Sequence, residues 1–271
     1  MADRARLHRI EPGTPVDLAD IGTADTSAAP GDKTTTKAAT VPLVDRLAEL
    51  QEVLWARRQE RVLVVLQGID TSGKGGTVSH VFDGVNPAGL KVTSFKAPSE
   101  SELERDYLWR VHANVPAAGE IGVFDRSHYE DVLAVRVLGL VPEARWRRRF
   151  DHINAFEQML ADEGTTVVKL LLHISKDEQK ARLEARLAEP QKHWKFQVGD
   201  LDARARWDDY QAAFADTVER TATDLAPWHV IPADKKWYRN WAVASILVET
   251  LEGMHLTWPV PEADLSSVTI E

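Results

Sequence analysis

Apolar residues recur along the chain with two different periods, and together they predict alternating strands and helices. Short runs rich in apolar residues predict strands at 62–66, 90–95, 119–125, 165–174 and 228–231. Apolar positions at helical spacing predict helices at 41–58, 78–85, 101–114, 175–188, 201–225 and 239–253. Alternation of this kind predicts an α/β fold, in which helices cover both faces of a parallel β-sheet.

The same pattern divides the chain into three parts. Residues 1–40 show little periodicity and are rich in Ala, Thr, Asp, Gly and Pro from about Gly13, which predicts an extended N-terminal arm. Residues 41–254 carry the periodic elements and form the predicted core domain. Residues 255–271 are expected to be a surface tail.

The first predicted strand leads directly into a glycine-rich loop with one lysine. Glycines let backbone N–H groups approach an anion closely, and the helix that follows adds its N-terminal partial charge. The spacing Gly68-x-x-x-x-Gly73-Lys74 fits a phosphate-binding loop, so we prefer this interpretation to a turn without ligand. The phosphate-binding candidates are Gly68, Gly73, Lys74, Gly75, Gly76 and Thr77.

Two carboxylates are candidates for a metal site beside this loop. Gly75 stands where the loop pattern usually has the Ser or Thr that holds magnesium, and Thr77 lies too far along the helix to replace it. Asp70 lies inside the loop, and Asp125 ends the third predicted strand, where it can meet the metal of a bound phosphate chain. We therefore predict that Asp70 and Asp125 bind Mg²⁺, with Mn²⁺ as an alternative ion.

Arg126 directly follows Asp125 and is a candidate for phosphate binding. A guanidinium at this position can hold phosphate oxygens at two points. The alternative is an Asp-Arg turn that caps a helix starting near Ser127. The neighbouring glycine loop favours phosphate binding.

Most charges on the helix expected at 175–188 have a local partner. Glu178 with Arg182, and Lys180 with Glu184, are spaced four residues apart in the favourable order. These residues are therefore expected to form an ordinary solvated helix face.

Three further cations lack such an explanation. Arg186 has only Glu189 as its best local partner, and Lys192 and Lys195 follow in a segment that Pro190 interrupts. We expect residues at about 176–200 to form a mobile helical lid that closes on phosphate, in preference to a plain surface role.

Charge and composition exclude several classes of protein. The formal net charge of −9 argues against a general nucleic-acid binder, although Lys and Arg concentrate between 145 and 206. No apolar run approaches the roughly 20 residues that span a bilayer, so no membrane partner is expected. The chain has no cysteine, which excludes disulfides and thiolate chemistry. The N-terminal residues lack the apolar core of a secretory signal, so the cytoplasm is the expected location.

Several blocks of the sequence, in one order, resemble the polyphosphate kinase 2 family, and the resemblance covers about 41–254. The blocks are Gly68-Ile-Asp-Thr-Ser-Gly-Lys-Gly-Gly-Thr77, Val85-Asn-Pro-Ala-Gly89, Thr93-Ser-Phe-Lys-Ala-Pro98, Phe124-Asp-Arg-Ser-His-Tyr-Glu-Asp-Val132, Leu172-His-Ile-Ser-Lys176, Lys192-His-Trp-Lys195, Trp207-Asp-Asp-Tyr210, Ala226-Pro-Trp228 and Ile231-Pro-Ala-Asp-Lys235.

The resemblance implies a P-loop kinase fold with a helical lid, and reversible transfer of a terminal phosphoryl group between inorganic polyphosphate and a nucleotide, with magnesium. Gly75 belongs to the loop of that family. The resemblance also assigns roles by position: an acidic pair at Asp70 and Asp125, the loop lysine at Lys74, a phosphate-binding arginine at Arg126, lid cations at Arg186, Lys192 and Lys195, and nucleotide contacts at Lys96 and Glu130.

The segment Ser127-His-Tyr-Glu-Asp131 is similar to members that accept AMP as well as ADP, so Glu130 is expected to contribute to that choice. Those members often carry Asn and Asp where this chain has Asp125 and Gly75. The expected partners are polyphosphate and adenine or other purine nucleotides, and the family implies a homodimer or homotetramer. Two alternatives stay open: an ATP-dependent small-molecule or nucleotide kinase, and a nucleotide-binding switch without catalysis.

Overall fold

The computed structural model describes residues 4–261, 265 and 268–270, and its core is a six-stranded sheet in the order β1-β6-β5-β2-β4-β3. All neighbouring strands run parallel except β1, which pairs antiparallel with β6. The strands are β1 (Arg9–Ile10), β2 (Arg61–Gln67), β3 (Leu90–Ser94), β4 (Ile121–Asp125), β5 (Thr165–His173) and β6 (Trp228–Pro232). The predicted α/β class is thereby confirmed.

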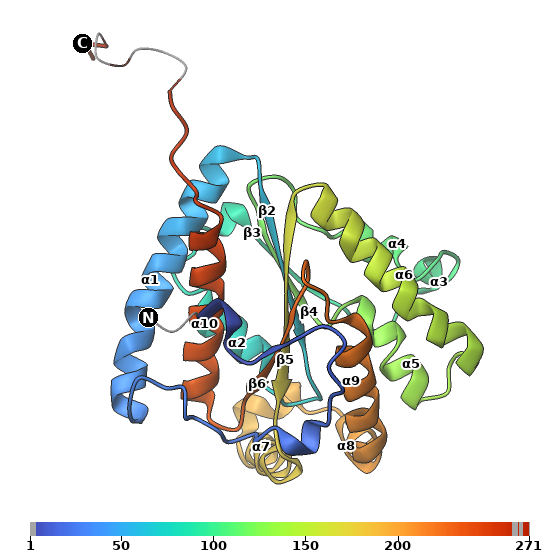
Figure 1. The fold of residues 1–271 in the computed structure, drawn as a ribbon. Helices are drawn as coiled ribbons and strands as arrows, with labels where there is room; N and C mark the ends of the chain where they lie inside the picture. Colours follow the sequence, from blue (N-terminus) through green and yellow to red (C-terminus); the bar gives the residue numbers. More distant parts are fainter. Residues whose placement is uncertain (1–3, 262–264, 266–267, 271) are drawn as a thin grey trace.

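Helices cover both faces of the sheet, as predicted: α1, α2 and α10 lie on one face, and α6 and α9 on the other (Figure 1). The helices are α1 (Lys33–Arg57), α2 (Lys74–Val81), α3 (Glu100–Leu103), α4 (Trp109–His112), α5 (Ala134–Val137), α6 (Glu143–Asp162), α7 (Lys176–Ala188), α8 (Gly199–Ala205), α9 (Trp207–Thr221) and α10 (Lys236–Gly253). Short 3₁₀ turns are η1 (Arg4–Arg6), η2 (Leu18–Asp20), η3 (Pro87–Gly89), η4 (His128–Asp131) and η5 (Pro190–Lys195).

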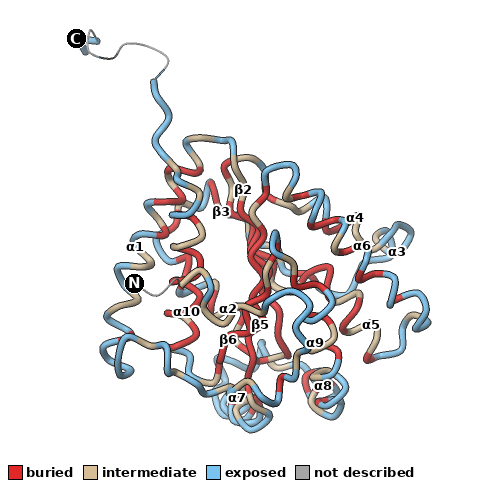
Figure 2. Tube along the Cα trace, viewed as in Figure 1, coloured by how far each residue is buried: buried red, intermediate tan, exposed pale blue. Residues whose placement is uncertain are grey.

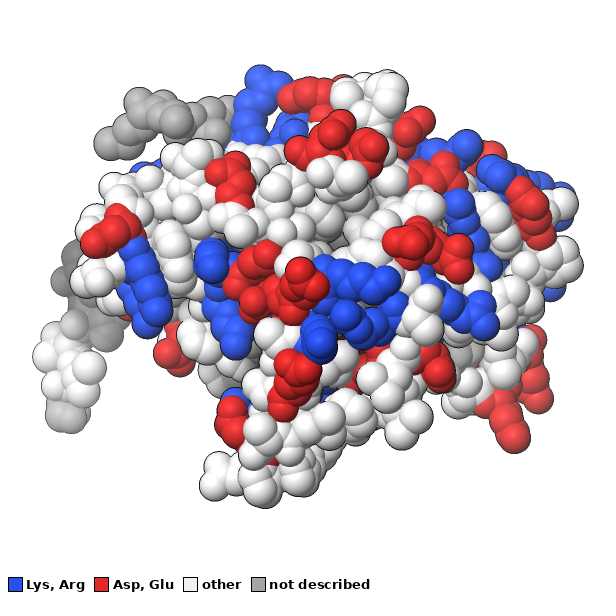
Figure 3. Space-filling view, turned by 90° about the horizontal axis from the view of Figure 1, so that it is seen from below, with Lys and Arg blue, Asp and Glu red and all other residues white. Residues whose placement is uncertain are grey.

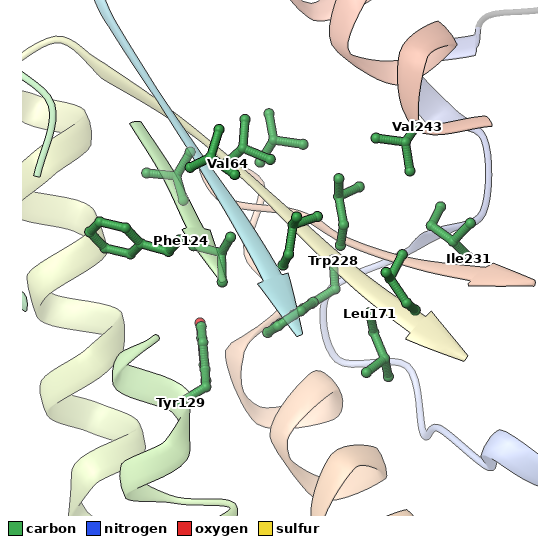
Figure 4. Packing of buried hydrophobic residues seen from close by; sticks show 14 of the residues in the cluster. Val64, Phe124, Tyr129, Leu171, Trp228, Ile231 and Val243 are labelled. Carbon is green, nitrogen blue, oxygen red and sulfur yellow. The ribbon is translucent and has the colours of Figure 1, made fainter. Parts of the chain in front are cut away.

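The central strands are buried on both faces, and the core follows them through the molecule. In Figure 2 the buried residues concentrate along the sheet, whereas α7 and α8 carry many exposed positions. Side chains such as Val64, Leu171 and Val243 pack within this core (Figure 4). Because β2 is parallel to both β4 and β5, the loops after these strands meet at one edge of the sheet.

The N-terminal residues differ from the extended arm expected for 1–40. The helix expected from residue 41 begins at Lys33, where Asp32 caps it by accepting from the Thr35 N–H at 2.8 Å. Before it, β1 pairs with the edge strand β6, and Leu18 is buried in the core. Long-range pairing therefore orders a segment whose composition alone indicates little structure.

Helix lengths also depart from the predictions. The helix expected at 101–114 is two short helices, α3 and α4, and the one expected at 201–225 is α8 followed by α9. Helix α6 was not predicted. Among the described residues, none of the helices is both long and apolar enough to cross a bilayer. In the predicted tail, residues 262–264, 266–267 and 271 lie outside the described residues.

Candidate active site

The glycine-rich loop joins β2 to α2 through backbone conformations that few residues adopt. The φ angles are +145° at Gly68, +70° at Thr71 and +106° at Gly73. Lys74 begins α2, and its Nζ donates to the Gly68 carbonyl at 2.8 Å. Burial lowers the pKa of Lys74, while Asp70 opposes that shift. The loop thus holds a cation over its own backbone, next to the exposed Gly75.

Gly73→Ala is expected to destabilise the loop and to weaken nucleotide binding. A positive φ costs a residue with a side chain about 1–3 kcal/mol, and a Cβ at this position would collide with the Arg239 guanidinium. Thermal unfolding with and without ADP would measure both effects. The matched control is Gly253→Ala at the end of α10, because a Cβ there meets nothing within 4 Å. A Gly73→Ala protein as stable and as responsive to ADP as the control would contradict this prediction.

Arg182 does not lie on a solvated face, contrary to the sequence interpretation. It keeps the predicted pair with Glu178, its Nε donating at 2.7 Å, but the side chain is buried. Its Nη1 donates to the carbonyls of Thr71 at 3.0 Å and Ser72 at 2.8 Å, and its Nη2 to that of Ala233 at 2.6 Å. Arg182 therefore connects α7 and the loop after β6 to the backbone of the phosphate-binding loop.

Arg239 is a second buried arginine behind the same loop, and sequence reasoning missed it. It is 2% exposed, and its guanidinium lies against Gly73. Burial, and then the charge of Arg182, lower its pKa to about 10. Its side chain donates to the Asn240 amide oxygen at 2.8 Å and 3.1 Å. Two arginines thus place positive charge behind the loop glycines.

The residues that end β4 meet the loop as predicted. The register pairs Leu66 of β2 with Asp125 of β4, and Arg126 follows with φ +62°. The Arg126 guanidinium forms an ion pair with Asp70. Burial lowers the pKa of Arg126, but the negative charges of Asp70 and Glu130 outweigh burial, so the pKa is raised overall. The structure thus brings Asp70, Lys74, Asp125 and Arg126 together.

The two aspartates fit the donor set of a magnesium site that is completed by phosphate and water. Magnesium in phosphoryl-transfer sites is usually bound by one or two carboxylates, with waters and substrate oxygens filling the octahedron. Asp70 pairs with Arg126, the residue that directly follows Asp125, so both carboxylates lie at one site. The described residues contain no group of three His, Cys, Asp or Glu side chains that could hold a metal by themselves.

The other predicted loop residues take different positions. Thr77 is buried, and its hydroxyl donates to the Gly73 carbonyl at 3.2 Å, inside the helix. Gly75 and Gly76 lie in the first turn of α2, where Gly75 is exposed. Gly75 is thus accessible to a ligand at the start of α2, whereas the Thr77 side chain is buried.

A cavity of about 860 Å³ extends from the loop between α3–α4, α5–α6 and α8–α9. Its wall contains Gly68, Asp70, Lys96, Arg126 and Glu130. The wall also contains the apolar residues Leu133, Leu138, Leu140, Val141 and Phe214, and the cations Arg105, Arg110, Arg145, Arg148 and Arg149. A cavity of this size that combines apolar and positively charged side chains fits a nucleoside with phosphates attached.

Glu130 is one of the acidic residues of the cavity wall. Burial raises its pKa, while the positive charges of Arg126 and Lys74 act in the opposite direction. Lys96 is exposed at the rim, and its carbonyl accepts from Arg110 Nη1 at 2.8 Å. Both residues that the resemblance assigns to the nucleotide therefore line the cavity.

The lid cations have partners that the sequence did not indicate. Arg186 pairs with Asp200 at 3.1 Å rather than with Glu189, which instead holds Lys192 at 2.6 Å. Lys195 is exposed and lies 4.9 Å from the Trp194 ring centroid. Figure 3 views the molecule from the side of α7 and α8 and shows Lys and Arg side chains gathered between acidic groups. The structure therefore does not bring Lys192 and Lys195 into the cavity.

Comparisons with known proteins agree with this geometry. The family model described as polyphosphate kinase 2 matches residues 31–258. The AMP/ADP-polyphosphate phosphotransferase of Meiothermus ruber is 54% identical over 98% of this chain and 100% of its own. The ADP-polyphosphate phosphotransferase of Rhodopseudomonas palustris is 42% identical over 80% of this chain and 79% of its own.

A solved structure shows the same fold along nearly the whole chain. The crystal structure of polyphosphate kinase 2 from Arthrobacter aurescens TC1 superposes with a TM-score of 0.94 at 48% identity, covering 97% of this chain and 94% of that one. The predicted P-loop kinase fold is thereby confirmed. With the family model spanning the loop, the strand ends and the lid, the chain belongs to the polyphosphate kinase 2 family.

Proposed function

We propose that this protein transfers the terminal phosphoryl group of inorganic polyphosphate to ADP and to AMP, reversibly. The observation that carries the proposal is a cavity of nucleotide size that opens from the phosphate-binding loop and is lined by apolar side chains as well as by several arginines. Its relatives' names support both acceptors, since one is an AMP/ADP-polyphosphate and another an ADP-polyphosphate phosphotransferase. The polyphosphate would approach from the lid side, where basic side chains gather (Figure 3).

In this reaction a phosphate oxygen of the nucleotide forms a bond to the terminal phosphorus, and the bond to the bridging oxygen of polyphosphate breaks. Positioning the reactants and neutralising their oxygens lower most of the barrier. Lys74 and Arg126 lie where they can neutralise those oxygens. The attacking oxygen is already ionised, so no strong base is required.

Asp70 and Asp125 would hold Mg²⁺ between the two substrates, and the ion would supply further positive charge to the phosphate oxygens. In the structure Asp70 is paired with Arg126, and Arg186 with Asp200. We propose that bound phosphate replaces these carboxylates as the partner of both guanidinium groups. Exchange at Arg186 would draw the lid, α7 to α8, toward the loop.

The test is a set of reactions with purified protein, Mg²⁺ and long-chain polyphosphate, with either AMP or ADP, followed by chromatography of the nucleotides. Product from both acceptors is expected, and reactions without polyphosphate should give none. Product from ADP alone would remove AMP from the proposal. Transfer from ATP but not from polyphosphate would indicate an ATP-dependent kinase, and thermal stabilisation by nucleotide without any transfer would indicate a binding switch.

A further inference from the structure

Gln67 is a fully buried amide that lies directly beneath the active site. It is the last residue of β2, is 1% exposed and precedes Gly68 of the phosphate-binding loop. The sheet register places it opposite Leu171, two residues along β5 from the buried Lys169. A buried amide costs free energy unless its oxygen and nitrogen both find partners. Its partners therefore indicate why an amide occupies this position.

One orientation of the Gln67 amide satisfies both of its ends. In that orientation the nitrogen donates to Glu130 Oε1 at 3.1 Å, and the oxygen accepts from the Ser127 hydroxyl and the Ser127 N–H, each at 3.1 Å. The reverse orientation turns the oxygen toward acceptors and the nitrogen toward donors. The amide thus links the end of β2 to the segment that carries Arg126 and Glu130.

Ser127 makes this link rigid. It is fully buried, and its hydroxyl also accepts from the Tyr129 N–H at 3.2 Å. The Tyr129 hydroxyl in turn donates to the buried Glu157 at 2.7 Å, which pairs with Lys169 at 2.6 Å. Glu130 is therefore the one member of this chain of contacts whose carboxylate reaches the cavity.

We propose that Gln67 is a positioning residue for acceptor choice, and that it acts by holding the Glu130 carboxylate against the phosphate site. The inference rests on the proposed use of both AMP and ADP. An ionised carboxylate held in the cavity wall with Asp70 and Arg126 repels an additional phosphate, so it penalises ADP more than AMP. Without the Gln67 donor, the carboxylate can rotate away, and this discrimination weakens.

The experiment compares the ratio of kcat/KM for AMP to kcat/KM for ADP in wild type, Gln67→Met, Glu130→Ala and the double variant. Both single variants are expected to lower the ratio about tenfold, a change that corresponds to about 1.4 kcal/mol. The double variant should match Glu130→Ala, because Gln67 has nothing to hold once the carboxylate is gone. Gln51→Met is the matched control, since Gln51 is a buried amide on α1 that forms no hydrogen bond within the described part of the chain.

Three results would overturn the inference. One is a ratio that falls in Glu130→Ala but not in Gln67→Met, which leaves the proposed function intact. Another is an equal loss with AMP and ADP in Gln67→Met, which indicates a purely structural amide. The third is additive effects in the double variant. Gln67→Glu provides a second variant, because it keeps the acceptor for Ser127 and, when ionised, lacks the donor for Glu130. A wild type that never uses AMP would instead remove the proposed function.

Discussion

Replacing Lys74 with methionine is expected to lower kcat about 100- to 1,000-fold, the usual effect of removing one preorganised charge from a transition state. Lys74 is 7% exposed and opens α2, and its Nζ reaches back over the loop to the Gly68 carbonyl at 2.8 Å. Methionine keeps the apolar stem of the side chain but removes the charge. Because burial already opposes that charge, the variant should retain its fold.

The measurement is steady-state turnover with polyphosphate and ADP, together with the midpoint of thermal unfolding. Lys180→Met is the control, since Lys180 is exposed on α7 and lies 3.8 Å from the exposed Glu184. Turnover of Lys74→Met within a few-fold of this control would show that the loop lysine does not neutralise the transferred phosphoryl group.

Asp70→Asn is expected to lower kcat at least about 100-fold and to raise the magnesium concentration needed for half-maximal rate. The amide keeps the size of the side chain but is a poorer ligand for a hard cation. Asp70 also pairs with Arg126, so the variant frees a guanidinium that lies in the cavity wall. Since this pair is partly exposed, its loss should change the free energy of unfolding by no more than about 1 kcal/mol.

Magnesium titrations of the rate would test this prediction, and Asp125→Ala should share the loss of turnover with folding intact. Asp83→Asn is the control, because Asp83 is exposed just beyond α2. Full recovery of either variant at high magnesium would show that its carboxylate contributes affinity for the ion but not to the transfer step.

The sheet and the phosphate-binding loop could be predicted because their signals are local. The apolar run of β2 ends at Leu66, with only Gln67 before Gly68, and the loop needs glycine at +145° and +106° within a few residues. Asp125 and Arg126 could be placed because parallel strands end at one edge of the sheet, and the register with β2 confirms that placement.

The rest of the site could not be predicted because its contacts join residues far apart in the sequence. Arg182 has a satisfactory partner four residues away in Glu178, and nothing local indicates its contacts with Thr71 and Ser72. Gln67 reads as one polar residue at the end of an apolar strand. Asp200, rather than Glu189, pairs with Arg186 because the fold brings α8 against α7. In each case tertiary packing, rather than sequence spacing, determines which residue is the hydrogen-bond or ion-pair partner.

The pairing of β1 with β6 sets an order of events during synthesis of the chain. Arg9 lies opposite His229, so β1 has no partner strand until β6 has been synthesised. Until then β6 is absent and β5 is the open edge of the nascent sheet. Contacts across so many residues form slowly and late. We therefore expect β1 to close the sheet only after β6 has been synthesised, so nascent chains depend until then on protection of that edge.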